Sequence, residues 1–174
     1  MLDSSDPRWV DPDVVRAAQR GDTLALNEVL DRLTPYVERV CGPIALDSGS
    51  DAAQDTLIAV MRALPTLRDP VALVGWVRAI AVREAVRHAR RDARHRGSSD
   101  DLLERVPAPG DPTLAADVRD VLERLTPEHR AVLVLRDLEG FDEAATAEVL
   151  NLPEGTIKSR LHRARGRFRK EWGS

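Results

Sequence analysis

The order of apolar and polar positions predicts helices along most of the chain. Asp11-Pro12-Asp13 marks a helix start, with a capping carboxylate and a proline in the first turn, and Gly21 marks its end. Asp22 then caps a second helix. Five aliphatic residues supply the buried side of that helix: Leu24, Leu26, Val29, Leu30 and Leu33.

The pattern after this helix predicts several interruptions. Pro35 predicts a kink or a new start, Gly42-Pro43 a break, and residues 47–50 a loop. A third helix is expected from about 51 to 64, with apolar positions at Leu57, Ile58, Met61 and Leu64. A fourth is expected from 71–75 to about 91, with an apolar stripe of Trp76, Val77, Ile80, Ala81 and Val86.

Residues 92–115 change in character, because Gly, Ser and Pro gather at 97–99 and 107–112. We interpret this stretch as a linker between two small helical domains. Helical spacing resumes at Val118, Val121, Leu122 and Leu125. Thr126-Pro127-Glu128 predicts the next helix start and Gly140 its end.

The last fifty residues predict a helix-turn-helix. Asp142 caps its first helix, and Asn151-Leu152-Pro153 forms the turn. On a helical wheel of the last helix, one face is apolar, with Ile157, Leu161, Ala164 and Phe168. The opposite face is cationic or small, which suits a helix in the major groove of duplex DNA.

Composition and charge distribution support this interpretation. Charged residues make up 32% of the chain and aromatic residues 3%, which favours an all-α fold over a β-sandwich or barrel. The net charge is −3. Yet residues 78–96 and residues 154–174 each hold seven basic against two acidic side chains. Two basic segments in an acidic chain indicate two phosphate-facing surfaces, although solvated helix faces would have the same composition.

Other features exclude several classes of protein. Cys41 is the only cysteine, so no disulfide within the chain and no thiolate metal cluster is expected. The acidic N-terminus does not resemble a signal peptide, and no apolar run approaches the roughly 18 residues that span a membrane. We therefore expect a soluble cytoplasmic protein without cofactor, metal or catalytic residues.

The C-terminal segment from Leu138-Glu139-Gly140-Phe141 to Arg165 resembles region 4 of bacterial sigma factors of the extracytoplasmic-function (ECF) group, in the sigma-70 family. The first half is similar to the same family. Residues 16–22 resemble its opening helix, residues 53–64 its polymerase-binding helix and residues 76–81 its promoter-melting helix. The resemblance spans about residues 13–170.

The resemblance implies an all-α protein with region 2 at 1–95, a flexible linker at 96–115 and region 4 at 116–174. Region 2 would bind the clamp helices of core RNA polymerase, through Asp51, Gln54, Asp55 and Arg62. Region 4 would bind the flap tip. The family also implies promoter DNA as a ligand and an anti-sigma factor as a partner, with the sigma factor itself a monomer that does not insert into membranes.

The same resemblance assigns residues to the two promoter elements. Region 2 would read the melted −10 element with the 68–75 loop and the following helix: Arg68, Leu73, Trp76, Arg78, Arg83, Arg87, Arg90 and Arg91. Trp76 could equally be a core residue. Region 4 would read the −35 duplex with Thr156, Lys158, Ser159, Arg160, His162, Arg163 and Arg167.

Three positions depart from the family pattern. Arg83 and Arg87 stand where the family often has Asn and Asp, which bears on base preference at −10. Leu73 replaces a common Phe in the −10 loop, and Thr146 replaces a larger aliphatic residue in the helix-turn-helix.

Three other functions stay open on the sequence alone. An enzyme is disfavoured, since no phosphate-binding glycine loop, paired-histidine metal spacing or nucleophilic triad is found. A dimeric helix-turn-helix repressor or response regulator would explain only the C-terminal half. An interaction protein could use the arginine-rich helices to bind an acidic partner.

Overall fold

A computed structural model describes residues 10–96 and 112–173, without the side chains of residues 96 and 112–116. All regular elements in these two ranges are helical, as the sequence predicts, and no strand occurs in them. Most of the expected linker, residues 97–111, lies outside the described part of the chain.

The predicted caps at the start of the chain are confirmed. α1 spans Pro12–Gln19, and the Asp11 carboxylate accepts a hydrogen bond from the Asp13 amide at 2.8 Å. Gly21 has a φ of +94°, a backbone conformation that favours glycine. Asp22 then caps α2, which spans Thr23–Ala45, by accepting bonds from the amides of Leu24 and Ala25.

The predicted new start at Pro35 and the predicted break at Gly42-Pro43 are wrong. The helix runs through Pro35 and through Gly42-Pro43, and the expected loop at 47–50 is a 3₁₀ turn (Leu46–Ser48) followed at once by α3 (Gly49–Ala63). Four side chains around these breaks are fully buried: Val37, Val40, Cys41 and Ile44. Burial of this apolar stripe outweighs the local cost of proline.

Gly49 allows a close approach of α2 and α3. A Cβ on Gly49 would lie 3.0 Å from the Cα of Gly42, so α2 and α3 approach backbone to backbone at this point. The tight reversal between them places Leu46 at a φ of +56°.

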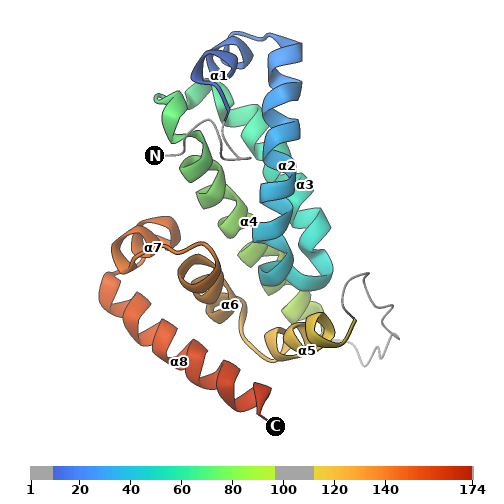
Figure 1. Cartoon of the computed structure of the whole chain (residues 1–174), viewed down its shortest axis with the longest axis vertical. Coiled ribbons are helices and arrows are strands. Elements are labelled where there is room, and N and C mark those ends of the chain that lie inside the picture. Colours follow the sequence, from blue (N-terminus) through green and yellow to red (C-terminus); the bar gives the residue numbers. More distant parts are fainter. Residues whose placement is uncertain (1–9, 97–111, 174) are drawn as a thin grey trace.

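α3, two 3₁₀ turns (Leu64–Thr66 and Pro70–Ala72) and α4 (Leu73–Arg96) complete the N-terminal half. α2, α3 and α4 form a three-helix bundle with α1 across one end (Figure 1). α3 buries Ala52, Ala53, Thr56 and Val60. Of the apolar positions expected in α3, Leu64 at its C-cap is buried, whereas Met61 is 43% exposed.

Residues 112–173 form four α-helices and one π turn. They are α5 (Pro112–Glu123), α6 (Pro127–Leu133), the π turn (Val134–Leu138), α7 (Glu143–Leu150) and α8 (Glu154–Trp172). Thr126 and Asp142 cap α6 and α7 as predicted. Asn151 adopts the left-handed conformation in the turn of the helix-turn-helix.

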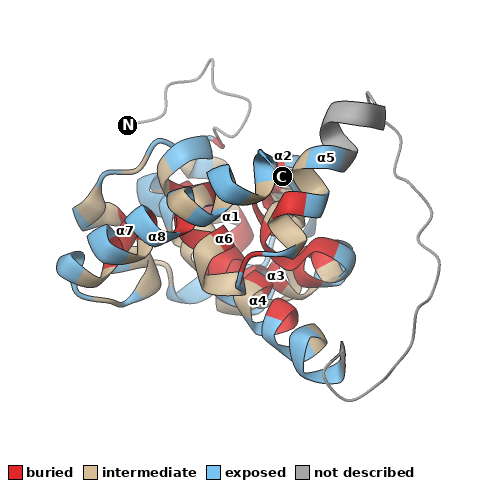
Figure 2. Cartoon of the chain, turned by 90° about the horizontal axis from the view of Figure 1, so that it is seen from below, coloured by how far each residue is buried: buried red, intermediate tan, exposed pale blue. Residues whose placement is uncertain are grey.

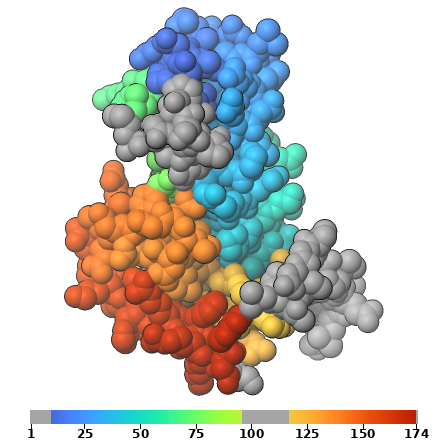
Figure 3. All heavy atoms as spheres, in the orientation of Figure 1, coloured from blue at the N-terminus to red at the C-terminus, as the bar shows by residue number. Residues whose placement is uncertain are grey.

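The two halves share one hydrophobic core. Ala131, Val134 and Leu135 of the C-terminal half are buried in the same cluster as residues of α2 and α4. Figure 2 shows the buried positions running through the helices of both halves, and Figure 3 shows the C-terminal half packed against the N-terminal bundle. A second, smaller cluster closes the helix-turn-helix itself, with Val132, Ala147, Ile157 and Leu161.

Arg130 places a buried charge inside the contact between the halves. Arg130 is 4% exposed, and its guanidinium donates to the carbonyl oxygens of Ile44 (2.7 Å), Leu122 (3.2 Å) and Leu125 (3.0 Å). The bond to Ile44 links α6 to the C-terminal end of α2.

No helix in the described ranges is long and apolar enough to cross a lipid bilayer.

Candidate nucleic-acid interface

α8 presents the predicted division into an apolar and a cationic face. Ile157, Leu161 and Ala164 are buried, whereas Lys158 and Arg163 are exposed. Ser159 and His162 are also exposed, and a shallow groove runs beside them, lined in part by Gly155 and Arg169. This exposed surface offers donors to bases and phosphates.

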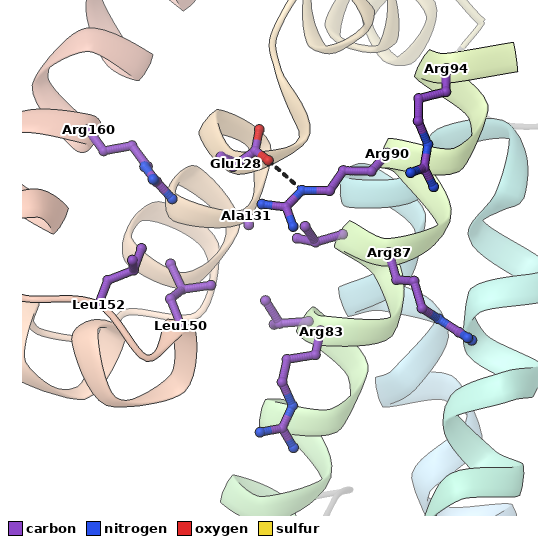
Figure 4. A pocket seen from close by; sticks show the side chains of 11 residues that line it. Arg83, Arg87, Arg90, Arg94, Glu128, Ala131, Leu150, Leu152 and Arg160 are labelled. Atoms are coloured by element: carbon purple, nitrogen blue, oxygen red, sulfur yellow. Dashed lines mark hydrogen bonds and ion pairs between the residues drawn. The ribbon is translucent and has the colours of Figure 1, made fainter. Parts of the chain in front are cut away.

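The predicted −35 residues do not all face the same way. Lys158, Ser159, His162 and Arg163 line the groove beside α8. Arg160 instead points across a different cleft, towards α4 (Figure 4). Arg167 is exposed, and Thr156 is half-buried.

The cleft opposite Arg160 has a volume of about 500 Å³ and lies between α4 and the C-terminal half. Four arginines of α4 line it, at helical spacing: Arg83, Arg87, Arg90 and Arg94 (Figure 4). Its floor is apolar, with Val82, Val86, Ala131, Leu150 and Leu152. Glu128 is the one acidic residue of its lining.

The electrostatics around this cleft are strongly positive. Burial raises the pKa of Glu128, but the hydrogen bond from Arg90 and the nearby guanidinium groups outweigh burial, so the pKa lies below its usual value. The pKa of His129 is also lowered, first by burial and then by Arg163, Arg160 and Arg167. An anion would relieve this accumulation of positive charge.

The predicted −10 arginines divide into paired and unpaired groups. Arg90 Nε bonds Glu128 Oε1 at 2.6 Å, and Arg87 is paired with Asp55 (3.0 Å) and with Glu84. Arg83 makes no ion pair with any residue that the structure describes.

Arg78 is enclosed by the C-terminal half. Its side chain is 12% exposed, and its guanidinium lies 4.0 Å from the centre of the Phe141 ring. Its Nε donates to the Tyr36 hydroxyl, which donates in turn to Glu139 Oε2 at 3.2 Å. Arg78 Nε also lies 3.6 Å from that carboxylate oxygen, and Arg39 binds the other oxygen at 3.1 Å. Burial raises the pKa of Tyr36 to about 12, so the hydroxyl stays protonated.

The remaining −10 candidates differ in access. Arg68 and Arg91 are exposed. Leu73 is 2% exposed, so in this conformation it supports the 68–75 loop from within and does not present itself to a base. Trp76 is half-buried and packs against the hydrophobic core, which favours the core alternative.

The predicted polymerase contacts lie on one face of α3. Asp51, Gln54, Asp55 and Arg62 fall within about 100° of the helical wheel. Asp51, Gln54 and Arg62 are exposed, and Asp55 is half-buried. Asp51 lies in the first turn rather than at the N-cap, which is Ser48, so the capping alternative for Asp51 is wrong.

Asp55 also belongs to a cluster with Glu84 and the buried His88. One potential ligand atom from each of the three lies within 4.8 Å of the others. His88 Nε2 bonds Asp55 Oδ2 at 2.8 Å, and this bond is the main cause that lowers the pKa of Asp55. The guanidinium of Arg87 already contacts both carboxylates and supplies the positive charge there.

Sequence reasoning missed four residues of these surfaces. Arg94 extends the spacing that begins at Arg83, so helical periodicity would have found it. Glu128, Arg130 and Glu139 act across the two halves. No local pattern indicates which distant side chain an acid or arginine meets.

The comparisons with known proteins agree with this arrangement. Residues 26–95 match the family model "Sigma-70 region 2", and residues 115–168 match "Sigma-70, region 4". The chain is 30% identical over 169 residues to the ECF RNA polymerase sigma factor SigM of Mycobacterium tuberculosis, covering 94% of this chain and 85% of SigM. The chain belongs to the ECF sigma factors.

Other relatives of this ECF sigma factor carry the same description. SigD of Mycobacterium bovis is 32% identical over 175 residues, covering 91% of this chain and 82% of SigD. Sigma factors are not enzymes, and this one directs transcription initiation.

Two solved structures share its fold. One is the sigma factor RpoE of Bartonella quintana in complex with the anti-sigma factor NepR, with a TM-score of 0.66, 23% identity and coverage of 83% of this chain and 94% of RpoE. The other is CnrH in complex with the cytosolic domain of CnrY, with a TM-score of 0.64, 22% identity and coverage of 95% and 96%.

Proposed function

We propose that this ECF sigma factor binds core RNA polymerase and reads a promoter at two places, with region 2 at 1–95, a linker at 96–115 and region 4 at 116–174. The observation that carries the proposal is the pair of cationic helices, α4 and α8, one in each matched region. The chain acts in the cytoplasm as a monomer without enzymatic activity.

Region 4 reads the −35 element as duplex. The exposed face of α8 supports this, because its basic and hydroxyl side chains project away from the core and Gly155 leaves room beside them. Bases are read by Lys158, Ser159 and Arg163, while arginines further along α8 hold phosphates.

Region 2 reads the −10 element as a melted strand. Unstacking a base costs a few kcal/mol, which cationic and apolar contacts must offset. The exposed guanidinium groups of α4 support this role, with Arg83 the clearest candidate because the described residues give it no acidic partner.

Polymerase binds two surfaces. The clamp helices contact the exposed face of α3 around Asp51, Gln54 and Arg62. The flap tip enters an apolar groove of about 310 Å³ at the junction of the halves, lined in part by Pro43, Leu122, Leu133, Leu138 and Phe168. Leu138 is 68% exposed there and extends the apolar lining of the groove, and a contiguous uncovered apolar surface is typical of a docking site.

An anti-sigma factor controls the chain in trans. Support comes from the structural neighbour RpoE, which was solved in complex with the anti-sigma factor NepR. Recovery of the native protein without a stoichiometric partner, from cells in which its promoter is silent, would count against this control.

The deciding experiment is run-off transcription by core polymerase on a library of random promoters, with and without the protein. We expect start sites that depend on the protein and share two spaced motifs. If no start site depends on it and the protein binds duplex DNA alone, the chain is a helix-turn-helix repressor.

A further inference from the structure

The cleft between α4 and the C-terminal half is lined by more cations than acids. Arg83, Arg94 and Arg160 line it and make no ion pair with any residue that the structure describes. Arg90 gives only its Nε to Glu128, at 2.6 Å, and its side chain is 61% exposed. Both Nη groups of Arg90 thus stay open to a second acceptor. The cleft therefore offers guanidinium donors to a further anion.

Glu128 shows that this part of the cleft holds an anion. Its carboxylate lies between Arg90 and Arg160 (Figure 4). Burial raises the pKa of Glu128, but the hydrogen bond from Arg90 and the charges of both arginines outweigh burial, and the pKa lies below its usual value. One carboxylate does not balance the cations, because the pKa of the neighbouring His129 is still lowered, first by burial and then by arginines that include Arg160.

The spacing of the arginines favours an extended anion. Arg83 and Arg94 lie eleven residues apart on α4, which is about 16 Å along the helix axis. A single phosphate binds one or two guanidinium groups and cannot span this distance. A ligand with several phosphates can contact arginines from both sides of the cleft at once.

The wall between the arginines is apolar. Val82 and Ala131 are buried beneath it, and Val86, Leu150 and Leu152 are half-buried at its surface. An inorganic polyanion would leave these aliphatic groups in water, whereas a ligand with an apolar ring would cover them. The cleft volume of about 500 Å³ lies within the range of about 300–1,000 Å³ that is typical of small-molecule sites.

We propose that this cleft binds a nucleoside polyphosphate, with its phosphates on Arg90, Arg94 and Arg160 and its nucleoside against the apolar wall. Planar guanidinium groups bind phosphate through two parallel hydrogen bonds, which suits this division of the ligand. Arg160 is available for this role because it points towards α4 and does not line the groove beside α8 (Figure 4). The ligand would join the two matched regions, and its binding does not require the proposed promoter contacts.

The first test measures the ligand class by isothermal titration calorimetry of the full-length protein, without polymerase or DNA. The probes are the four ribonucleoside triphosphates, inorganic tripolyphosphate and adenosine, at about 0.15 M salt to screen long-range attraction. We expect at least one nucleotide to bind at least about five-fold more tightly than tripolyphosphate, and adenosine to bind more weakly than either. Equal affinities for tripolyphosphate and the nucleotides, or no binding of any nucleotide, would overturn the proposal.

The second test locates the site with three variants of equal charge change. Arg94→Gln and Arg160→Gln remove a cation from opposite sides of the cleft. Arg167→Gln is the control, since Arg167 is an exposed arginine of α8 outside the lining. Circular dichroism verifies that each variant is folded. We expect both cleft variants to bind the nucleotide at least about five-fold more weakly than the control.

Two results of this comparison would overturn the proposal. An equal loss in all three variants would show a general attraction of nucleotides to basic helices. A loss for Arg94→Gln alone would place the nucleotide on the surface of α4 that is proposed to hold the −10 strand, outside the cleft. Failure of run-off transcription would leave these measurements unaffected, because they contain neither polymerase nor promoter.

Discussion

At the scale of single residues, the most informative side chain is the buried Arg130. A guanidinium cannot lose its charge in a protein, so burial requires acceptors. Arg130 finds three backbone carbonyls: one at the end of α2, one in the last turn of α5 and one in the turn between α5 and α6. One residue thereby joins three segments of the chain.

We expect Arg130→Met to lower the free energy of unfolding by about 3 kcal/mol, because it removes several charge-assisted hydrogen bonds and leaves buried carbonyls without donors. Arg124→Ala is the control. Arg124 pairs with Glu171 at 3.1 Å but its side chain is 56% exposed, so its loss should cost at most about 1 kcal/mol. Urea unfolding measures the free energy of unfolding of both variants. An equal loss of stability in the two would contradict this role for Arg130.

His129 makes the stability depend on pH. Its pKa is lowered in the folded state by burial and by Arg163, Arg160 and Arg167, with Glu128 opposing. The unfolded chain therefore takes up this proton at a higher pH than the folded one, and the free energy of unfolding falls as the pH drops below about 6.5.

Thermal unfolding between pH 7.5 and 5.5 measures this effect. His129→Gln should flatten the dependence in that interval, since it removes the titrating group. An unchanged slope in the variant would assign the dependence to other groups.

At the scale of elements, close packing decides where helices begin and end. The backbones of α2 and α3 meet at Gly42 and Gly49, where neither residue has a side chain to separate them. The contact requires glycine at position 49, whereas a Cβ on Gly42 would meet nothing within 4 Å.

Gly49→Ala should destabilise the protein by about 1–3 kcal/mol, because the new Cβ would lie 3.0 Å from the Cα of Gly42 and the helices would have to shift. Gly166→Ala in α8 is the matched control. A Cβ there meets nothing within 4 Å, so we expect a gain of about 0.5–1 kcal/mol from helix propensity. Calorimetry measures both changes in stability: a decrease is expected for Gly49→Ala and an increase for Gly166→Ala.

The exposed face of α8 allows a test of base reading. We expect Arg163→Ala to weaken transcription from −35-dependent promoters by about 1–3 kcal/mol if the side chain makes a bidentate base contact. A uniform loss over all −35 sequences would make Arg163 a phosphate contact, and no loss would contradict the assignment of this face.

At the scale of the whole molecule, the two matched regions are packed as one body. Ala131, Val134 and Leu135 are buried among side chains of α2 and α4, so neither half completes its core alone. We therefore expect a single cooperative unfolding transition.

Differential scanning calorimetry checks this expectation. Leu135→Ala should lower the stability by about 2–5 kcal/mol and move the whole transition, because Leu135 is fully buried in the shared core. Two separable transitions, of which the variant shifts only one, would show that the halves fold independently.

Local signals predicted the fold well where residues close in sequence determine it. The caps at Asp11, Asp22, Thr126 and Asp142 and the buried face of α8 all follow from neighbours within four positions or from helical periodicity. α2 could not be predicted in full, because the packing that overrides its prolines comes from α3 and α4. The contact of Tyr36 with Glu139 spans 103 positions, and only the folded chain brings the two together.

Cys41 has a practical and a biological consequence. It is the chain's single cysteine and is fully buried; its thiol lies 3.7 Å from the Ala81 carbonyl oxygen, and burial raises its pKa to about 11. Thiolate is the species that oxidants and alkylating reagents attack, so at neutral pH this sulfur is nearly inert. Peroxide therefore does not oxidise Cys41 in the folded molecule. A thiol-reactive dye will label a cysteine introduced at the surface without reacting with Cys41, so the native residue can be kept.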